Sequence, residues 1–272
     1  MSEIKTTLKR LKTGKSPGYD AIPAEMLKFS SPHIIAALHK LYNHVMEKGE
    51  YPEIWNINAI TPVHKKDDSL NPNNYRGIST NSAIGKIFSM ILNDRINQYL
   101  HDNDIIHKNQ AGFRKKHRTT DYILTLHTMV KKYQSMNKPL YCSFIDLKKC
   151  FDTVWRSGLL YKLQANCLNG RLYNIIKSMY NNIKFYVKLD DKMTPAFQTD
   201  NGVKQGCPLS PTLFSLFIND LVELLDSTAI DQPVLDGLTI SSLLFADDIV
   251  ITSTSKEGLQ SSINHLHDYT NK

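Results

Sequence analysis

Two adjacent carboxylates between aliphatic runs constrain this chain more than any other feature. Asp247 and Asp248 follow residues 243–246 (Leu-Leu-Phe-Ala), and residues 249–251 (Ile-Val-Ile) come directly after them. Two short aliphatic runs joined in this way predict a β-hairpin with both acids at its tip. Unpaired charge beside a core is costly, and a bound divalent cation, which takes carboxylate oxygens as ligands, removes that cost. An ordinary Asp-Asp turn is the alternative that these residues alone leave open.

A second acid, far upstream, favours the metal-binding interpretation. Residues 140–145 (Leu-Tyr-Cys-Ser-Phe-Ile) predict a strand with Asp146 at its end, and the segment from Lys148 to Trp155 is expected to turn away into a helix. Phosphoryl transfer with two metal ions requires carboxylates that bridge ions roughly 3.5–4 Å apart. Asp146 and Asp247 are about a hundred residues apart in sequence. Only a shared sheet can bring them together.

Six sequence blocks follow one another in a fixed order. They are KTGKSPGYDAIP at residues 12–23, NYRGIS at 74–79, QAGFR at 110–114, DLKKCFDTV at 146–154, GVKQGCPLSP at 202–211 and FADD at 245–248. In this order the blocks resemble those of the reverse transcriptases, particularly the enzymes of non-LTR (LINE-like) retrotransposons. A lone ADD would be a weak signal, whereas six ordered blocks over nearly the whole chain are a strong one.

The resemblance implies a fold as well as an activity. We expect an α+β protein with polymerase fingers and palm, in which an antiparallel palm sheet packs on helices. Residues 1–137 would be fingers-like, mostly helical with an N-terminal extension, and residues 138–272 would be the palm-like catalytic region. The thumb is expected to be missing, as in a fragment or decayed copy of a longer protein.

The resemblance also implies roles for particular residues. Asp146, Asp247 and Asp248 would be the catalytic metal ligands for two Mg²⁺ ions, with Mn²⁺ able to substitute, while Asp152 is expected to cap or to pair with Lys149 or Arg156. The reaction would be attack of a primer 3′-hydroxyl on a deoxynucleoside triphosphate. The partners would be an RNA template, a DNA primer and dNTPs.

Five further positions match the family's nucleotide-binding pattern. Phe151 stands where the family carries the bulky residue that excludes a 2′-hydroxyl, although a plain core phenylalanine is the alternative. Arg76 and Lys65 match triphosphate-contacting positions, where a planar guanidinium can hold phosphate oxygens bidentately. Either could instead be a surface cation, and His64-Lys65-Lys66 leaves the alignment of the lysine open. Gln205 and Gly206 match the nucleotide-pocket loop.

Departures from the family pattern are modest. Cys150 stands where alanine is more usual, and Phe245 where tyrosine is more usual. Both changes approximately conserve bulk, and neither removes a proposed ligand.

Composition adds weaker arguments about partners and location. The net charge is +7 and the pI is about 9.0, which suits an acidic partner. Arg114, Lys115, Lys116 and Arg118 form a basic run that predicts contact with a nucleic-acid backbone, unless it is only a solvated surface. The four cysteines form no C-x-x-C pair, and no apolar run approaches the ~18 residues of a membrane span. We therefore expect an intracellular protein, in the nucleus or cytoplasm, without a membrane partner.

Apolar spacing predicts the other main elements. Helices are expected over Ser31–Lys48, around Ile84–Tyr99, over Leu172–Tyr180 after an introductory Asn169-Gly170, from Ser210 through Leu225 with Ser210 able to cap, and from Ser255 to about Tyr269 with a capping box at Thr254. A strand is expected over Lys184–Leu189. Strands that alternate irregularly with helices indicate α+β rather than a doubly wound sheet.

Two classes of function remain after these arguments. One is the core of an RNA-directed DNA polymerase that acts within a longer protein. The other is a catalytically incomplete remnant that only binds nucleic acid. A two-metal nuclease is disfavoured, because Phe151 and the Gln205 loop would have no evident use in it.

Overall fold

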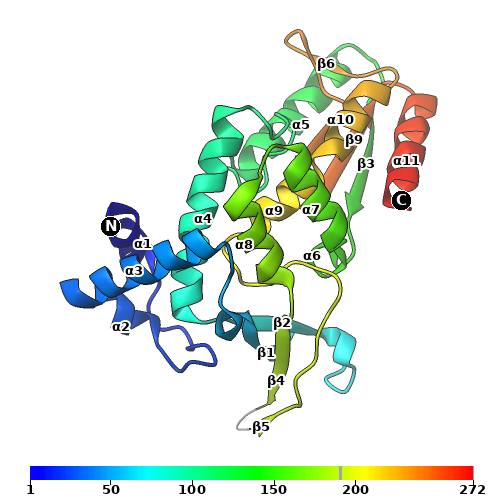
Figure 1. Ribbon diagram of the computed structural model, residues 1–272. Coiled ribbons are helices and arrows are strands. Elements are labelled where there is room, and N and C mark those ends of the chain that lie inside the picture. Colours follow the sequence, from blue (N-terminus) through cyan, green and yellow to red (C-terminus); the bar gives the residue numbers. More distant parts are fainter. Residues whose placement is uncertain (190–191, 272) are drawn as a thin grey trace. The chain divides into compact units, whose positions relative to one another are not determined.

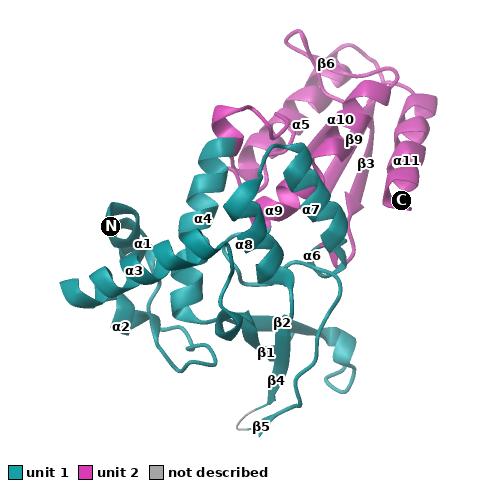
Figure 2. Cartoon of the chain, in the orientation of Figure 1, with its two compact units in different colours: residues 1–99, 151–210 teal, residues 100–150, 211–272 magenta. Residues whose placement is uncertain are grey.

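The structure, a computed structural model, describes residues 1–189 and 192–271 and divides into two compact units (Figures 1 and 2). Each unit is assembled from two separate stretches of the chain. Unit 1 contains residues 1–99 and 151–210, and unit 2 contains residues 100–150 and 211–272. The predicted boundary between a fingers-like region (residues 1–137) and a palm-like region (residues 138–272) is a functional division, and it stays a prediction.

Unit 1 is mostly helical around a mixed sheet. Its elements are α1 (Ser2–Arg10), α2 (Ala24–Lys28), α3 (Pro32–Lys48), η1 (Glu53–Asn56), β1 (Ile57–His64), η2 (Pro72–Asn74), β2 (Tyr75–Thr80), most of α4 (Ala83–Asp102), most of α6 (Cys150–Thr153), α7 (Arg156–Ala165), α8 (Gly170–Tyr180), β4 (Lys184–Leu189) and β5 (Lys192–Met193). The strand order is β2-β1-β4-β5, with β1 antiparallel to β2 and parallel to β4. The predicted helices α3, α4 and α8 and the strand β4 are confirmed.

Aromatic side chains form the centre of the unit 1 core. Tyr42 of α3, Trp55 of η1 and Phe88 of α4 pack against one another and Tyr51, with ring centroids between 5.3 and 6.2 Å apart. All four side chains are buried. The hydroxyl of the buried Tyr42 has a hydrogen-bond partner, because it donates to the carbonyl of Ile84 at 2.9 Å.

Unit 2 is an antiparallel sheet with helices packed against it. Its elements are α5 (Thr119–Ser135), β3 (Tyr141–Asp146), most of α9 (Ser210–Phe217), α10 (Asn219–Thr228), β6 (Val234–Leu235), β7 (Leu238–Thr239), β8 (Ser242–Phe245), β9 (Asp248–Ser253) and α11 (Lys256–Thr270). The main sheet has the order β3-β9-β8 and is antiparallel throughout. Helix α11 packs on β3 and β9, and α10 packs on β8 and α11. This arrangement confirms the mixed α+β class.

Two helix predictions in this part of the chain were wrong in detail. The single helix expected from Ser210 through Leu225 is two helices, α9 and α10, separated at Ile218. The Ser210 hydroxyl, which was expected to cap this helix, donates to the carbonyl of Lys204 at 2.7 Å. At α11 the N-cap is Ser255 rather than Thr254, because the Ser255 hydroxyl accepts the Gly258 N–H at 2.9 Å.

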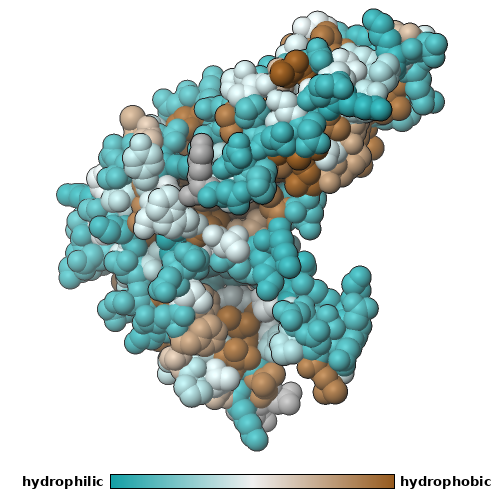
Figure 3. Space-filling model, turned by 90° about the vertical axis from the view of Figure 1, so that its right-hand side faces the viewer, coloured by the Kyte–Doolittle hydropathy of each residue, from teal (hydrophilic) through white to brown (hydrophobic). Residues whose placement is uncertain are grey.

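On the face drawn in Figure 3 hydrophilic residues predominate, with smaller hydrophobic areas among them. No helix within the described residues is long and apolar enough to cross a membrane.

Candidate active site

The two adjacent carboxylates lie at the turn of the predicted hairpin. Phe245 of β8 pairs with Asp248 of β9, so Ala246 and Asp247 form a two-residue turn. Ala246 has φ of +63°, in the left-handed region that such tight turns require. The aliphatic residues on both sides are largely buried, which fixes the hairpin in the sheet.

The third carboxylate lies directly across the sheet from this hairpin. Asp146, the last residue of β3, is the register partner of Asp248 in the antiparallel β3–β9 pair. The Leu147 N–H donates to the Asp247 carbonyl at 3.4 Å, which holds the end of β3 beside the turn. Cross-strand partners have Cβ atoms about 4.5–5.5 Å apart, so two acids face each other here.

No described cation compensates this carboxylate pair. Asp146 and Asp248 are exposed and Asp247 is partly buried. No described residue forms a hydrogen bond or ion pair with any of the three side chains. Like charges directly opposite each other on a sheet are destabilising. A cation would remove this repulsion, and hard carboxylate oxygens suit Mg²⁺ or Mn²⁺.

The three side chains do not form a compact ligand set by themselves. Within the described part of the chain, no group of three or more His, Cys, Asp or Glu residues is arranged so that it could hold a metal ion. The backbones of Asp146, Asp247 and Asp248 come together as the sequence predicted, whereas ion binding by their carboxylates stays a prediction.

In unit 1, the segment that carries Phe151 is bonded to the segment that carries Gln205. The Val203 N–H donates to the Phe151 carbonyl at 2.7 Å, and the Gly202 N–H donates to the Val154 carbonyl at 2.8 Å. Gly202 has φ of +86°, and a Cβ there would lie 2.7 Å from the carbonyl oxygen of Asp152. Only glycine allows this close approach of the two segments.

Gly206, in the predicted nucleotide-pocket loop, also requires glycine. Its φ is +86°, and a Cβ would lie 2.8 Å from the carbonyl oxygen of Ser79 in β2. The loop therefore lies against the β1–β2 hairpin within unit 1.

Asp152 pairs with the predicted pocket residue Gln205. The Gln205 side-chain amide donates to an Asp152 carboxylate oxygen at 2.5 Å. The prediction that Asp152 caps or pairs with Lys149 or Arg156 was therefore wrong. Because this bond uses the amide nitrogen, it orients Gln205 and leaves its side-chain oxygen as a possible acceptor.

A cavity of about 480 Å³ opens beside this pair within unit 1. Its walls include Gly77 and Ser79 of β2, Phe185 of β4, and both Asp152 and Gln205. A volume of this size lies in the range of small-molecule sites. Phe151 does not line the cavity, so a role in excluding a 2′-hydroxyl stays a prediction.

Arg156 lines the same cavity, a position that was not predicted from the sequence. Its guanidinium donates to the carbonyls of Thr199, Asn201 and Gly202, and also to the Thr199 hydroxyl. Partial burial lowers the pKa of Arg156, while Tyr180 and Asp200 act in the opposite direction. The side chain organises the 199–202 segment.

The two predicted triphosphate-binding cations lie on the β1–β2 hairpin. Arg76 is the register partner of Val63, and Lys65 follows the last residue of β1. Both side chains are exposed, and neither has a hydrogen bond or ion pair with a described residue. They are free to meet an anion.

Lys204 has the opposite environment. Only 3% of the residue is exposed, and its ammonium donates to Asn56 Oδ1 at 2.5 Å. The ammonium also lies 4.9 Å from the centroid of the Tyr51 ring. Burial lowers the pKa of Lys204 to about 8. Burial of this lysine was not predicted from the sequence.

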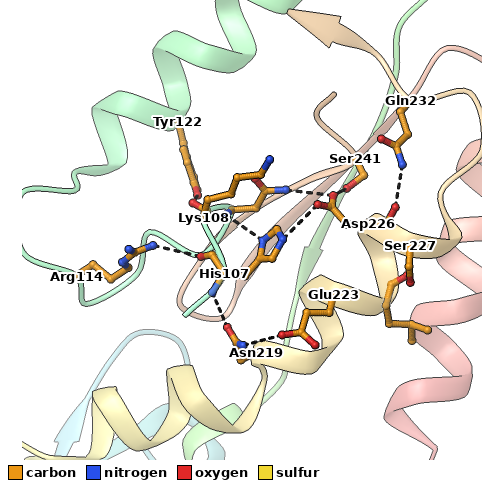
Figure 4. Close-up of polar contacts among 12 residues, drawn as sticks. His107, Lys108, Arg114, Tyr122, Asn219, Glu223, Asp226, Ser227, Gln232 and Ser241 are labelled. Atoms are coloured by element: carbon orange, nitrogen blue, oxygen red, sulfur yellow. Dashed lines mark hydrogen bonds and ion pairs between the residues drawn. The ribbon is translucent and has the colours of Figure 1, made fainter. Parts of the chain in front are cut away.

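The basic run of unit 2 is only partly available to a ligand. Arg114 is half-buried and donates to the carbonyls of His107 and Gln110 at 3.2 Å each, so it supports its own loop (Figure 4). Lys115, Lys116 and Arg118 are exposed. Contact with nucleic acid stays a prediction for all four residues.

Residues 63–272 match the family model described as reverse transcriptase (RNA-dependent DNA polymerase). The chain belongs to the reverse transcriptase family. The resemblance seen in the six sequence blocks is thereby confirmed.

Named relatives refine this assignment. A probable RNA-directed DNA polymerase from transposon BS of Drosophila melanogaster is 30% identical over 81% of this chain and 24% of its own length. The RNA-directed DNA polymerase from mobile element jockey of the same organism is 28% identical over 99% of this chain and 29% of its own length. The reverse transcriptase chain is thus a distant relative of non-LTR retrotransposon polymerases and spans 24% and 29% of the length of these two.

Solved structures support the fold independently. Apo telomerase from Candida tropicalis, truncated of its C-terminal domain, aligns over 86% of this chain and 51% of its own with a TM-score of 0.58. Telomerase from Candida albicans aligns over 84% of this chain and 43% of its own with a TM-score of 0.57. The sequence identities are 14% and 13%, so these matches concern the fold of the reverse transcriptase chain alone.

Proposed function

We propose that this chain is the core of an RNA-directed DNA polymerase, in which a primer 3′-hydroxyl attacks the α-phosphate of a dNTP and pyrophosphate leaves. The observation that carries the proposal is the Asp146–Asp248 cross-strand pair, which has no described cation partner and lies beside the Asp247 turn. A structural pair of this kind costs stability unless a bound ion offsets the repulsion. The names of the transposon relatives agree with the activity.

Asp146, Asp247 and Asp248 would hold two Mg²⁺ ions, or Mn²⁺ in their place. When bound, such ions supply a Lewis acid for the phosphate and lower the pKa of an attacking hydroxyl. The rest of the work is positioning, because phosphoryl transfer leaves little covalent chemistry to the protein.

The nucleotide would be bound by residues of unit 1. Arg76 and Lys65 carry free charges for a triphosphate, and guanidinium geometry suits two phosphate oxygens at once. Gln205, oriented by Asp152, offers an oxygen acceptor to a sugar or base. Phe151 would exclude the 2′-hydroxyl of a ribonucleotide.

The partners that follow are an RNA template, a DNA primer and dNTPs. Exposed Lys115, Lys116 and Arg118 would contact phosphates of the template or primer. These cations also support the alternative, a catalytically incomplete remnant that binds nucleic acid. An intracellular location agrees with both.

Primer extension on poly(rA)/oligo(dT) with Mn²⁺ separates the two functions. The wild-type chain should incorporate dTTP, and Asp247→Asn should abolish incorporation while it retains template binding. Asp236→Asn is the matched control, because Asp236 is an exposed acid at another hairpin turn of unit 2. Binding without incorporation by the wild-type chain would favour the remnant, and full activity in Asp247→Asn would contradict the metal assignment.

A further inference from the structure

The loop between α4 and α5 is anchored firmly at its base within unit 2. Asn219 Oδ1 accepts the backbone N–H of His107 at 2.8 Å. Asp226 faces His107 Nε2 at 3.3 Å and accepts from Asn109 Nδ2 at 3.3 Å (Figure 4). Ser241 donates to the same carboxylate. These bonds hold residues 107–109 against α10.

Beyond this anchor the loop runs along the edge of β8. The Leu244 N–H donates to the Asn109 carbonyl, and the Ala111 N–H donates to the Leu244 carbonyl, each at 2.9 Å. Gln110 and Leu244 thus form a parallel bridge. The loop extends the sheet beside the strand that leads into the Ala246–Asp247 turn.

Gln110 makes the direct link to that turn. Its side chain is fully buried, and its Oε1 accepts from the backbone N–H of Gly112 at 3.0 Å and of Ala246 at 3.3 Å. Two N–H donors can be accepted only by the carbonyl oxygen of the amide. A Cβ on Gly112 would lie 2.1 Å from the Ala246 nitrogen, so glycine is required for this contact.

The other end of the Gln110 amide has an unusual environment. Gln110 Nε2 is buried and has no hydrogen-bond partner among the described residues. A buried donor without a partner costs roughly 1–3 kcal/mol. The donor end of the amide is therefore held at a cost, which the two hydrogen bonds accepted by Oε1 offset.

We propose that Gln110 is a positioning residue, which fixes the Ala246–Asp247 turn so that the Asp247 carboxylate is held ready for a divalent cation. This inference rests on the proposed function for the cation, but the link between Gln110 and the turn does not. An ion that binds only one turn conformation has an apparent affinity reduced by the fraction of molecules in that conformation. Loss of the Gln110 acceptor should therefore weaken metal binding without removing any ligand.

The test compares three variants of the full chain. Gln110→Met keeps the shape of the side chain but cannot accept the Ala246 N–H. Gln110→Glu keeps a side-chain oxygen in the acceptor position and should restore the wild-type turn. Gln232→Met is the matched control, because Gln232 is another glutamine of unit 2 with a side chain bonded to the backbone; it is partly buried and donates to the carbonyls of Asp226 and Ala229.

Two readouts are measured, neither of which requires polymerase activity. Hydrogen–deuterium exchange of a peptide covering residues 243–249 reports the turn, and Mn²⁺ titration followed by electron paramagnetic resonance reports metal binding. Gln110→Met should speed exchange of the turn about fivefold or more, since about 1 kcal/mol of hydrogen bonding is lost. Its apparent Kd for Mn²⁺ should rise roughly threefold to tenfold. Gln110→Glu and Gln232→Met should resemble the wild-type chain in exchange.

Unchanged exchange of the turn in Gln110→Met would overturn the inference. Faster exchange with unchanged Mn²⁺ affinity would reduce Gln110 to a structural residue and would also overturn it. Should Gln110→Met fail to fold, Gly112→Ala tests whether the turn controls metal binding, because its methyl group must displace Ala246 while Gln110 stays intact; unchanged Mn²⁺ affinity in that variant would overturn the inference. A wild-type chain that binds no Mn²⁺ would instead contradict the proposed function, and the exchange result would then decide the link to the turn.

Discussion

Replacing Lys204 with methionine tests the buried charge of unit 1 through its dependence on pH. Lys204 is 3% exposed, and no described carboxylate forms an ion pair with it. Desolvation by burial lowers its pKa from 10.5 to about 8. Between these two values the unfolded chain binds more protons than the folded one, so the free energy of unfolding rises with pH. The buried Lys204 charge therefore destabilises the folded chain fully below about pH 8, and this destabilisation decreases as the pH rises toward 10.5.

The magnitude follows from the same two pKa values. The cost of the buried ammonium is about 3 kcal/mol at pH 7 and about 1 kcal/mol at pH 9.5. Methionine removes this cost but leaves Asn56 Oδ1 without the Lys204 donor, a penalty of roughly 1–3 kcal/mol that does not depend on pH. We therefore expect the stability of the wild-type chain to gain about 2 kcal/mol relative to Lys204→Met between pH 7 and pH 9.5.

The assay is equilibrium unfolding in urea for both proteins at the two pH values. Lys177→Met is the control, because Lys177 is exposed on α8 in the same unit. The Lys177 variant should follow the wild-type chain in parallel at both pH values. A Lys204→Met difference that stays constant from pH 7 to pH 9.5 would refute the reasoning that a charged amine is buried here.

Three further outcomes follow from the site. Phe151→Val should reduce discrimination against ribonucleotides by at least about tenfold in single-nucleotide incorporation; unchanged discrimination would assign Phe151 to the core. Lys115→Ala combined with Lys116→Ala should make the salt dependence of nucleic-acid binding less steep by roughly 1.4–1.8 in log–log slope, measured by fluorescence anisotropy, and an unchanged slope would mark both as solvated surface. Gly206→Ala should lower the free energy of unfolding by roughly 1–3 kcal/mol, because its φ is +86°; a stability equal to wild type would contradict the close approach to β2.

Local pattern was enough to predict the elements that build the carboxylate site. Aliphatic runs on both sides of the Asp pair predicted the β8–β9 hairpin. The alternation of polar and apolar residues predicted β4 with the bounds Lys184–Leu189 that the structure shows. The antiparallel pairing of β3 with β9, which places Asp146 opposite Asp248, could be inferred only from the need for the acids to meet.

Features set by long-range contacts could not be predicted from the sequence. The break between α9 and α10 precedes Asn219, whose side chain accepts from His107 and donates to Ile105 more than a hundred residues away. Asp152 pairs with Gln205 rather than with a neighbouring base, because tertiary packing brings the two segments together. Nothing local to Lys204 distinguishes it from the exposed lysines.

The central claim is that Asp146, Asp247 and Asp248 hold divalent cations. The most direct measurement is backbone cleavage by hydroxyl radicals generated from Fe²⁺ bound in place of Mg²⁺, with the fragments mapped by mass spectrometry. We predict cleavage close to residue 146 and to residues 247 and 248, suppressed by excess Mg²⁺ and absent in Asp247→Asn. Cleavage confined to other parts of the chain, or unaffected by Asp247→Asn, would contradict it.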